Sequence, residues 1–180
     1  MGQDIELPEK GIILIVSKSN NYHETNKKII KILVNGKKKN CIYMSLNKPS
    51  SALIEDFKDS AIDISKILII DCVTKLAGEE VERAGNIIFV ESPQSLTEMG
   101  SILEGALKGM SAKGSFLFLD SVTTMLLYNS TKSVAMFIHF LILKIRHYGM
   151  SGVIVSMEDE GEAKQIISQI SQFCDCKITV

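Results

Sequence analysis

The chain has 180 residues, of which 46% are hydrophobic and 23% are charged, and its formal net charge at pH 7 is −1. This composition is typical of a folded protein with a sizeable core and argues against a disordered chain. A net charge so close to zero also argues against a protein that binds nucleic acid or anionic membranes through bulk positive charge.

The start of the chain, MGQDIELPEK, lacks the apolar stretch of a secretory signal. The longest apolar run, SVAMFIHFLILKIRHYG, is too short and too interrupted to span a membrane. We therefore expect a cytoplasmic protein without a membrane partner. The four cysteines show no CxxC spacing and are expected to be reduced thiols rather than metal ligands.

Short apolar runs alternate along the chain with longer segments of helical period. The predicted strands are 11–17, 41–46, 66–72, 86–91, 115–121, 152–157 and 176–180. The predicted helices are 23–35, 50–58, 95–110, 131–148 and 161–173. Most strands are continuously apolar, as in parallel sheets that are buried on both faces. The alternation predicts one α/β domain over residues 1–180, with three layers and a mostly parallel central sheet.

In sheets of this kind, ligands bind beyond the carboxyl ends of the strands. Any site is therefore expected among the residues that follow the strands, namely 17–25, 45–48, Asp71, Glu91, 120–124 and 157–160.

Several motifs in the second half of the chain occur in a characteristic order. An apolar strand ends in Asp120-Ser121-Val122-Thr123, a long helix ends in Leu143-Lys144 and Gly149, and the next strand ends in Ser156-Met157-Glu158. This order resembles the core of the KaiC-like branch of the RecA ATPases. The closing ISQFCDCKITV is similar to the last strand of that family. The resemblance covers nearly the whole chain and implies a RecA-like, P-loop NTPase-type fold and an archaeal source.

The segment SKSNNYHETN occupies the place of the family's phosphate loop, G-x-x-x-x-G-K-[ST]. In this alignment, Lys18 replaces the first glycine, His23 the second glycine and Glu24 the lysine. The variable positions include Asn20 and Asn21, and Thr25 alone keeps its residue type. Glycines let the backbone N–H groups wrap a phosphate chain, and the lysine contacts the phosphates, which a carboxylate repels. We therefore expect no tight binding of ATP and no cofactor.

A second departure concerns the family's catalytic carboxylate, which follows the second strand. That place reads Ser45-Leu46-Asn47-Lys48 and contains no acid. By the resemblance, Asp120 and Ser121 form a Walker B-like motif, in which Asp120 alone remains in the position that holds Mg²⁺ through water in active relatives. Without the lysine, Asp120 is expected to be structural, as a partner of Thr25 or of nearby backbone donors. No catalytic residue and no metal ligand is expected.

The roles of the loop residues are predicted accordingly. His23 is expected to be a helix-start or surface histidine. Glu24 lies in the first helical turn, where the helix dipole favours a carboxylate, and it is expected to fill the place that a phosphate would take.

The leading hypothesis is a non-catalytic KaiC-like protein, a pseudo-ATPase that acts as a regulatory or assembly partner. By family analogy, its partner is an active paralogue or a second copy of itself. One alternative is a protein that holds a nucleotide or another small molecule in the altered crevice without hydrolysis. Its polar contacts would be Lys18, Asn20, Asn21, Asp120 and Ser121.

A further alternative is a recombinase-like accessory protein that binds nucleic acid through its lysines at 27, 28, 31 and 37–39. The near-neutral charge and the low aromatic content, 6% without tryptophan, make this alternative the weakest.

Overall fold

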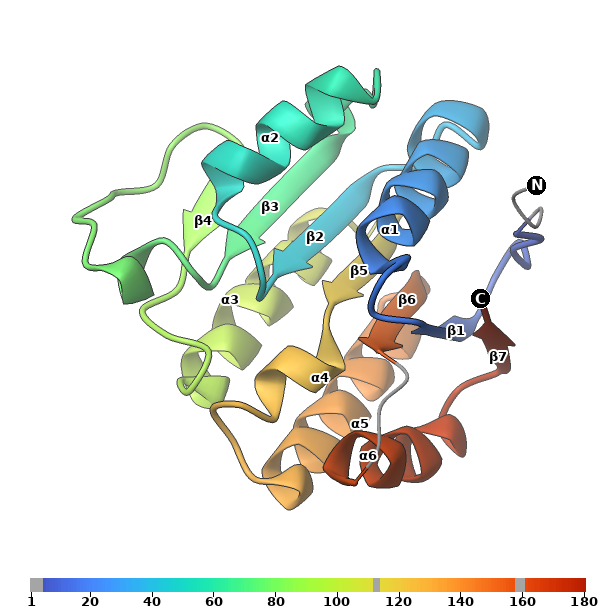
Figure 1. The fold of residues 1–180 in the computed structure, drawn as a ribbon. Coiled ribbons are helices and arrows are strands. Elements are labelled where there is room, and N and C mark those ends of the chain that lie inside the picture. The colour runs from blue at the N-terminus through green and yellow to red at the C-terminus, as the bar shows by residue number, and fades with distance from the viewer. Residues whose placement is uncertain (1–4, 112–113, 158–160) are drawn as a thin grey trace.

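The computed structural model describes residues 5–111, 114–157 and 161–180, which form a seven-stranded sheet with helices on both faces (Figure 1). The strands are β1 (Ile12–Ser17), β2 (Cys41–Ser45), β3 (Ile67–Asp71), β4 (Ile87–Phe89), β5 (Phe116–Asp120), β6 (Ser151–Met157) and β7 (Cys176–Thr179). The helices are α1 (Tyr22–Lys31), α2 (Ser50–Asp59), α3 (Leu96–Gly109), α4 (Val122–Met125), α5 (Thr131–His147) and α6 (Glu162–Ser171).

The sheet has the strand order β4-β3-β2-β5-β6-β1-β7, and all of these neighbouring strands pair in parallel. Every residue of β1, β2 and β5 is buried, which explains why these segments read as continuous apolar runs. The predicted α/β architecture with a parallel central sheet is confirmed.

The two faces of the sheet are covered by different helices (Figure 1). Helices α1 and α2 pack on one face, where Ile13 and Ile15 of β1 lie. Helices α3, α5 and α6 cover the other face, where Ile12 and Leu14 lie. Because side chains alternate along a strand, each strand supplies both layers of the core.

The prediction and the structure differ most in two helical segments. The predicted helix 23–35 consists of α1 followed by one π-helical segment, Ile32–Gly36. The short helix α4 is not among the predicted helices, and its N-cap Ser121 accepts a hydrogen bond from the Thr124 N–H through Oγ. Such a cap stabilises a short helix that has no periodic pattern of its own.

Asp175 fixes the closing strand against the rest of the molecule. Its Oδ2 accepts a hydrogen bond of 2.7 Å from Ile12 N, and its Oδ1 lies 2.9 Å from Arg146 Nη2 at the end of α5. Gly11 adopts a φ of +111°, and a Cβ at this position would lie 2.9 Å from Asp175 Oδ2. The close approach therefore requires glycine at position 11.

In the part of the chain that the structure describes, no helix combines the length and the apolar character needed to cross a membrane.

Candidate functional site at the carboxyl ends of the strands

The register of the sheet brings three polar residues to the same level. Ser45 at the end of β2 lies opposite Asp71 of β3 on one side and opposite Asp120 of β5 on the other. Because all strands are parallel, the turn between β1 and α1 and the start of α4 follow at this same edge of the sheet. The edge is therefore the candidate site.

The turn between β1 and α1, where the resemblance places the phosphate loop, is short. Asn21 N donates to Lys18 O over 3.0 Å, and α1 begins at Tyr22, with Thr25 N donating to Asn21 O over 2.9 Å. Half of the eight loop positions are therefore helical. Lys18, Asn20 and Asn21 are exposed, whereas Asp120 and Ser121 are buried. These five residues were predicted to contact one ligand together. In the structure, three of them are exposed and two are buried, so they do not form one site.

Glu24 does not take the place of a phosphate. Its side chain is 69% exposed, and its Oε1 lies 2.5 Å from Lys27 Nζ on the same helix. The expectation that Glu24 fills the vacated site is therefore wrong. His23 is exposed, as predicted. Partial burial and the nearby Lys48 ammonium lower the pKa of His23.

Tyr22, one residue before His23, is the loop residue that reaches the end of the sheet. Its side chain is buried, and Asn47 Nδ2 donates to its Oη over 2.6 Å. The same Asn47 nitrogen lies 3.2 Å from Asp120 Oδ1. Asn47 Oδ1 in turn accepts from the hydroxyl of Thr124, in α4. A single amide thus connects the loop, β5 and α4.

Asp120 has a second side-chain partner, because Tyr43 Oη of β2 donates to its Oδ2. We refer to Tyr22, Tyr43, Asn47, Asp120 and Thr124 together as the Tyr22–Asp120 network. The partners of Asp120 are therefore side chains, not Thr25 or backbone donors as predicted.

The two tyrosines of this network were missed by the sequence analysis. Tyr43 lies in a strand of continuously buried residues, and Tyr22 occupies a variable position of the loop pattern. The sequence did contain one signal for them. Each tyrosine lies in a segment that was expected to be buried or next to a site, and a buried tyrosine hydroxyl normally needs a hydrogen-bond partner.

Burial determines the protonation of Asp120. Its side chain is 3% exposed, and burial raises the pKa of its carboxyl to about 8. The group is therefore mainly neutral at pH 7, and both of its oxygens are hydrogen-bonded within the network. A neutral, internally bonded carboxyl is a poor partner for a hydrated Mg²⁺ ion, which prefers free carboxylates. The residues present do not fit a magnesium–nucleotide complex.

Asp71, by contrast, is an ionised structural carboxylate. Burial alone would raise its pKa, but hydrogen bonds from Thr74, Val73 and Ser50 lower the pKa of Asp71 below its usual value. The bond from Ser50 N, 2.6 Å long, satisfies a free N–H at the start of α2. Asp71 therefore has no free lone pair directed at a ligand.

Lys48 stands beside the position of the family's catalytic acid and pairs with Asp56 of α2 at 2.5 Å. Within the described residues, no group of three or more His, Cys, Asp or Glu side chains could hold a metal ion. The predicted position Met157–Glu160 lies partly outside the described residues, which omit 158–160.

A family model for the KaiC ATPase matches residues 8–180. Among solved structures, the chain is similar to a KaiC-like protein from the hyperthermophilic archaeon Pyrococcus horikoshii OT3, with 14% identity and a TM-score of 0.66 over 96% of this chain and 71% of that chain. It is also similar to an uncharacterized protein from Pyrococcus horikoshii in complex with an unknown peptide, with 13% identity and a TM-score of 0.70 over 97% of this chain and 78% of that chain. No curated protein matches the chain.

The two solved structures establish the fold, and both are archaeal proteins. The family model spans the sheet from β1 to β7 and includes the Tyr22–Asp120 network. The chain therefore belongs to the KaiC ATPase family.

Proposed function

We propose that this chain is a non-catalytic member of its family, a pseudo-ATPase that acts as a regulatory or assembly partner of another protein. The observation that supports this most is the bond between Asn47 and Asp120. The resemblance assigns these two positions to the catalytic acid and the magnesium carboxylate. Here they are bonded to one another, and Asn47 is also bonded to Tyr22 of the loop.

A phosphate chain that entered this edge would meet three obstacles. The loop has no glycine between residues 17 and 35, its lysine position carries Glu24, and the buried Tyr22 already occupies the end of the sheet. Breaking the network would leave buried polar groups without partners, each at a cost of about 1–3 kcal/mol. Nucleotide binding would have to supply this energy without the contacts that normally provide it.

The partner role rests on the loss of the catalytic parts and on analogy with relatives. One solved structure of this fold contains an unknown peptide, and we extend peptide or protein recognition to this chain as part of the proposal. Self-association and pairing with an active paralogue both remain compatible with it.

The two alternatives receive less support. The exposed Lys18, Asn20 and Asn21 do not share an enclosed site with Asp120, which weakens the small-molecule alternative. The nucleic-acid alternative loses half of its six lysines to internal contacts. Lys27 pairs with Glu24, Lys37 Nζ lies 2.8 Å from Glu9 Oε1, and Lys39 Nζ donates to Glu9 O.

Calorimetric titration and thermal unfolding in the presence of millimolar Mg·ATP test the proposal. We expect no saturable heat and no rise in melting temperature. A ligand at a hundredfold excess over its Kd would stabilise the protein by about 2.7 kcal/mol, which is readily detected. A rise of several degrees, or phosphate release that disappears in Asp120→Ala, would overturn the proposal.

A further inference from the structure

Asn35 and Gly36 end the π-helical segment that follows α1, far from the Tyr22–Asp120 network in the sequence. Asn35 is the one asparagine of the sequence that is followed by glycine. The backbone nitrogen of the residue after an asparagine can attack the side-chain carbonyl carbon, and a Cβ on that residue hinders the attack. At this pair, the intramolecular reaction therefore meets the least steric hindrance in the chain.

The fold does not need glycine at position 36. Gly36 is exposed, and a Cβ built there would have no heavy atom within 4 Å. It is also not among the glycines with a positive φ. Gly36 thus serves neither a left-handed turn nor a close packing contact, and alanine can replace it without strain.

The side chain of Asn35 links two parts of the chain. Its Nδ2 donates to Ala61 O over 2.6 Å, and its Oδ1 accepts from Asp63 N over 3.0 Å. Ala61 has a φ of +53° in the turn after α2, and Asp63 caps the short 3-10 helix Ile64–Lys66. Both bonds lie at the surface, so water reaches the amide.

The local charge favours the first step of the reaction, in which the Gly36 N–H loses its proton. Positive charge stabilises the resulting anion, and three lysines, 37–39, follow directly. The charge of one of them reaches this corner of the molecule. The hydrogen bond from Ser65 lowers the pKa of Asp63 most, and the Lys38 ammonium also contributes.

We propose that Asn35 is a site of spontaneous deamidation, with the backbone nitrogen of Gly36 as the nucleophile. A bond forms from this nitrogen to Asn35 Cγ and the bond from Cγ to Nδ2 breaks. Nδ2 leaves as ammonia with the proton that Gly36 gave up. The cyclic imide then takes up one water molecule and opens at either carbonyl, which gives aspartate or isoaspartate. The net change is amide plus water to acid plus ammonia, without an oxidant, a reductant or a cofactor.

The two hydrogen bonds of the amide control the rate. While they are formed, they hold the side chain of Asn35 against Ala61 and Asp63, so the reaction proceeds when this contact opens. Solvent-exposed hydrogen bonds near the end of a helical segment open at low cost. Asn35 in the folded chain should therefore react more slowly than in a short peptide, but faster than the other asparagines of the chain.

Deamidation would remove the link that Asn35 makes. A carboxylate cannot donate to Ala61 O, and its oxygen would face that carbonyl oxygen instead. It would also add negative charge beside Asp63. The product would loosen the contact between the end of the α1 segment and the turn after α2. This inference is independent of the proposed function.

Ageing of the full chain at mildly alkaline pH, followed by tryptic peptide mapping with mass spectrometry, tests the proposal. Cleavage after Lys31 and Lys37 releases Asn35 in the peptide 32–37, which contains no other asparagine. We expect this peptide to gain the mass of an amide-to-acid exchange with time and to yield an isoaspartate form. Gly36→Ala should slow the gain by about tenfold or more, because its methyl group hinders the attack.

A synthetic peptide of sequence ILVNGKKK, aged in parallel, provides the reference for an unstructured chain. An unchanged 32–37 peptide after the reference has reacted, an earlier mass gain at another asparagine, or an equal rate in Gly36→Ala would overturn the proposal.

The structural consequence is measured separately by thermal unfolding. Asn35→Asp should lower the melting temperature by several degrees, and the aged chain should show the same loss in proportion to its deamidated fraction. Asn40→Asp, the same change at a nearby exposed asparagine, should leave the melting temperature unchanged. An Asn35→Asp variant as stable as the unaltered chain would show that deamidation leaves the fold intact, which would overturn this consequence.

Discussion

The amide of Asn47 has both of its polar atoms in use, and each contact reaches a different part of the chain. Its nitrogen serves Tyr22 and Asp120, and its oxygen serves Thr124. An amide suits this position because it donates and accepts at once, which a carboxylate cannot do. Asn47 thus acts as the centre of a structural network.

Replacing Tyr22 with phenylalanine tests the link between loop and sheet. Tyr22→Phe keeps the buried ring but removes the acceptor for Asn47 Nδ2, so we expect the free energy of unfolding to fall by about 1 kcal/mol. Urea denaturation measures this change. Tyr128→Phe is the matched control, because no hydrogen bond to its hydroxyl is found among the described residues, and it should be neutral within about 0.5 kcal/mol. Equal stability of the two variants would show that the Tyr22 hydroxyl contributes nothing.

Asp120→Asn tests the neutral state of the buried carboxyl. Asp120 accepts from Tyr43 Oη at Oδ2 and from Asn47 Nδ2 at Oδ1, and asparagine is the uncharged residue of the same shape that cannot titrate. Because burial raises the folded pKa to about 8, above an unfolded value of about 3.9, the native state holds a proton that the unfolded chain lacks between these limits. The unfolding free energy should therefore fall as pH rises through this window.

The slope of this fall is at most about 1.4 kcal/mol per pH unit. The stability of the unaltered chain, compared with that of Asp120→Asn by denaturation at several pH values, should decline from pH 4 to pH 8 and then level off. A difference that stays constant with pH would contradict the raised pKa.

At the scale of elements, α3 is a helix whose intrinsic stability is lowered by two glycines. It contains Gly100 and Gly105 within its span, and glycine in a helix interior is less favourable than alanine by about 1 kcal/mol. Gly105 is exposed, with no atom near a Cβ, whereas a Cβ at Gly100 would contact the Phe140 ring at an ordinary distance.

Alanine at each glycine separates helix propensity from packing. Gly105→Ala should raise the free energy of unfolding by about 0.5–1 kcal/mol through propensity alone. Gly100→Ala should match or exceed this gain, because the added methyl group also contacts Phe140. Chemical denaturation measures both. A destabilised Gly100→Ala would mean that α3 and α5 are already packed too closely at this point to accept a methyl group.

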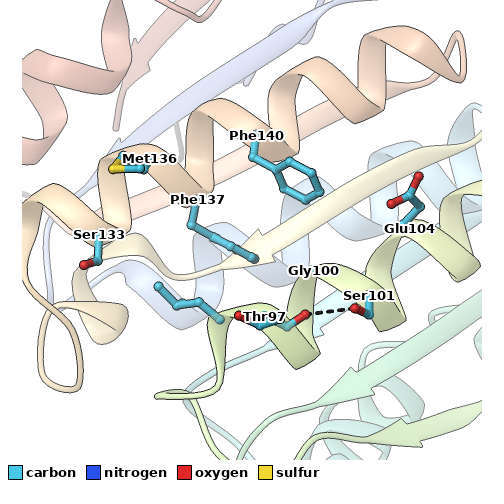
Figure 2. Close-up of a pocket in the computed structure, with 9 residues that line it drawn as sticks. Thr97, Gly100, Ser101, Glu104, Ser133, Met136, Phe137 and Phe140 are labelled. Atoms are coloured by element: carbon cyan, nitrogen blue, oxygen red, sulfur yellow. Dashed lines mark hydrogen bonds between the residues drawn. The ribbon is translucent and has the colours of Figure 1, made fainter.

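At the scale of the whole molecule, the polar edge of the sheet and a hollow between two helices lie in different places. The Tyr22–Asp120 network lies at the carboxyl edge of the sheet, and the hollow between α3 and α5 (Figure 2) opens on the layer formed by α3, α5 and α6.

Restoring nucleotide binding should therefore need several changes at once. Glu24→Lys alone should slightly lower the denaturation midpoint, because it places a lysine beside Lys27 and Lys28 near the positive end of the α1 dipole, and it should not produce binding. We expect measurable Mg·ATP binding only when glycines at 18 and 23 and lysine at 24 are combined with Tyr22→Ala. Calorimetry compares the variants, with Glu24→Gln as the control for loss of charge. Micromolar binding by Glu24→Lys alone would show that charge, not loop shape or the tyrosine, was the missing part.

The sequence by itself was sufficient to predict the seven strands and five longer helices, because continuous apolar runs and the helical period are local properties of the chain. It also led to the hypothesis of an altered phosphate loop, since the absence of glycines and lysine concerns residue types at adjacent positions. The tertiary structure decided which side chains meet. Tyr43 and Asp120 are 77 residues apart, and they bond only because β2 and β5 are neighbours in register. Sequence patterns contain no information on such distant pairs, so the burial of Tyr22 and the raised pKa of Asp120 emerged only from the packing of the elements.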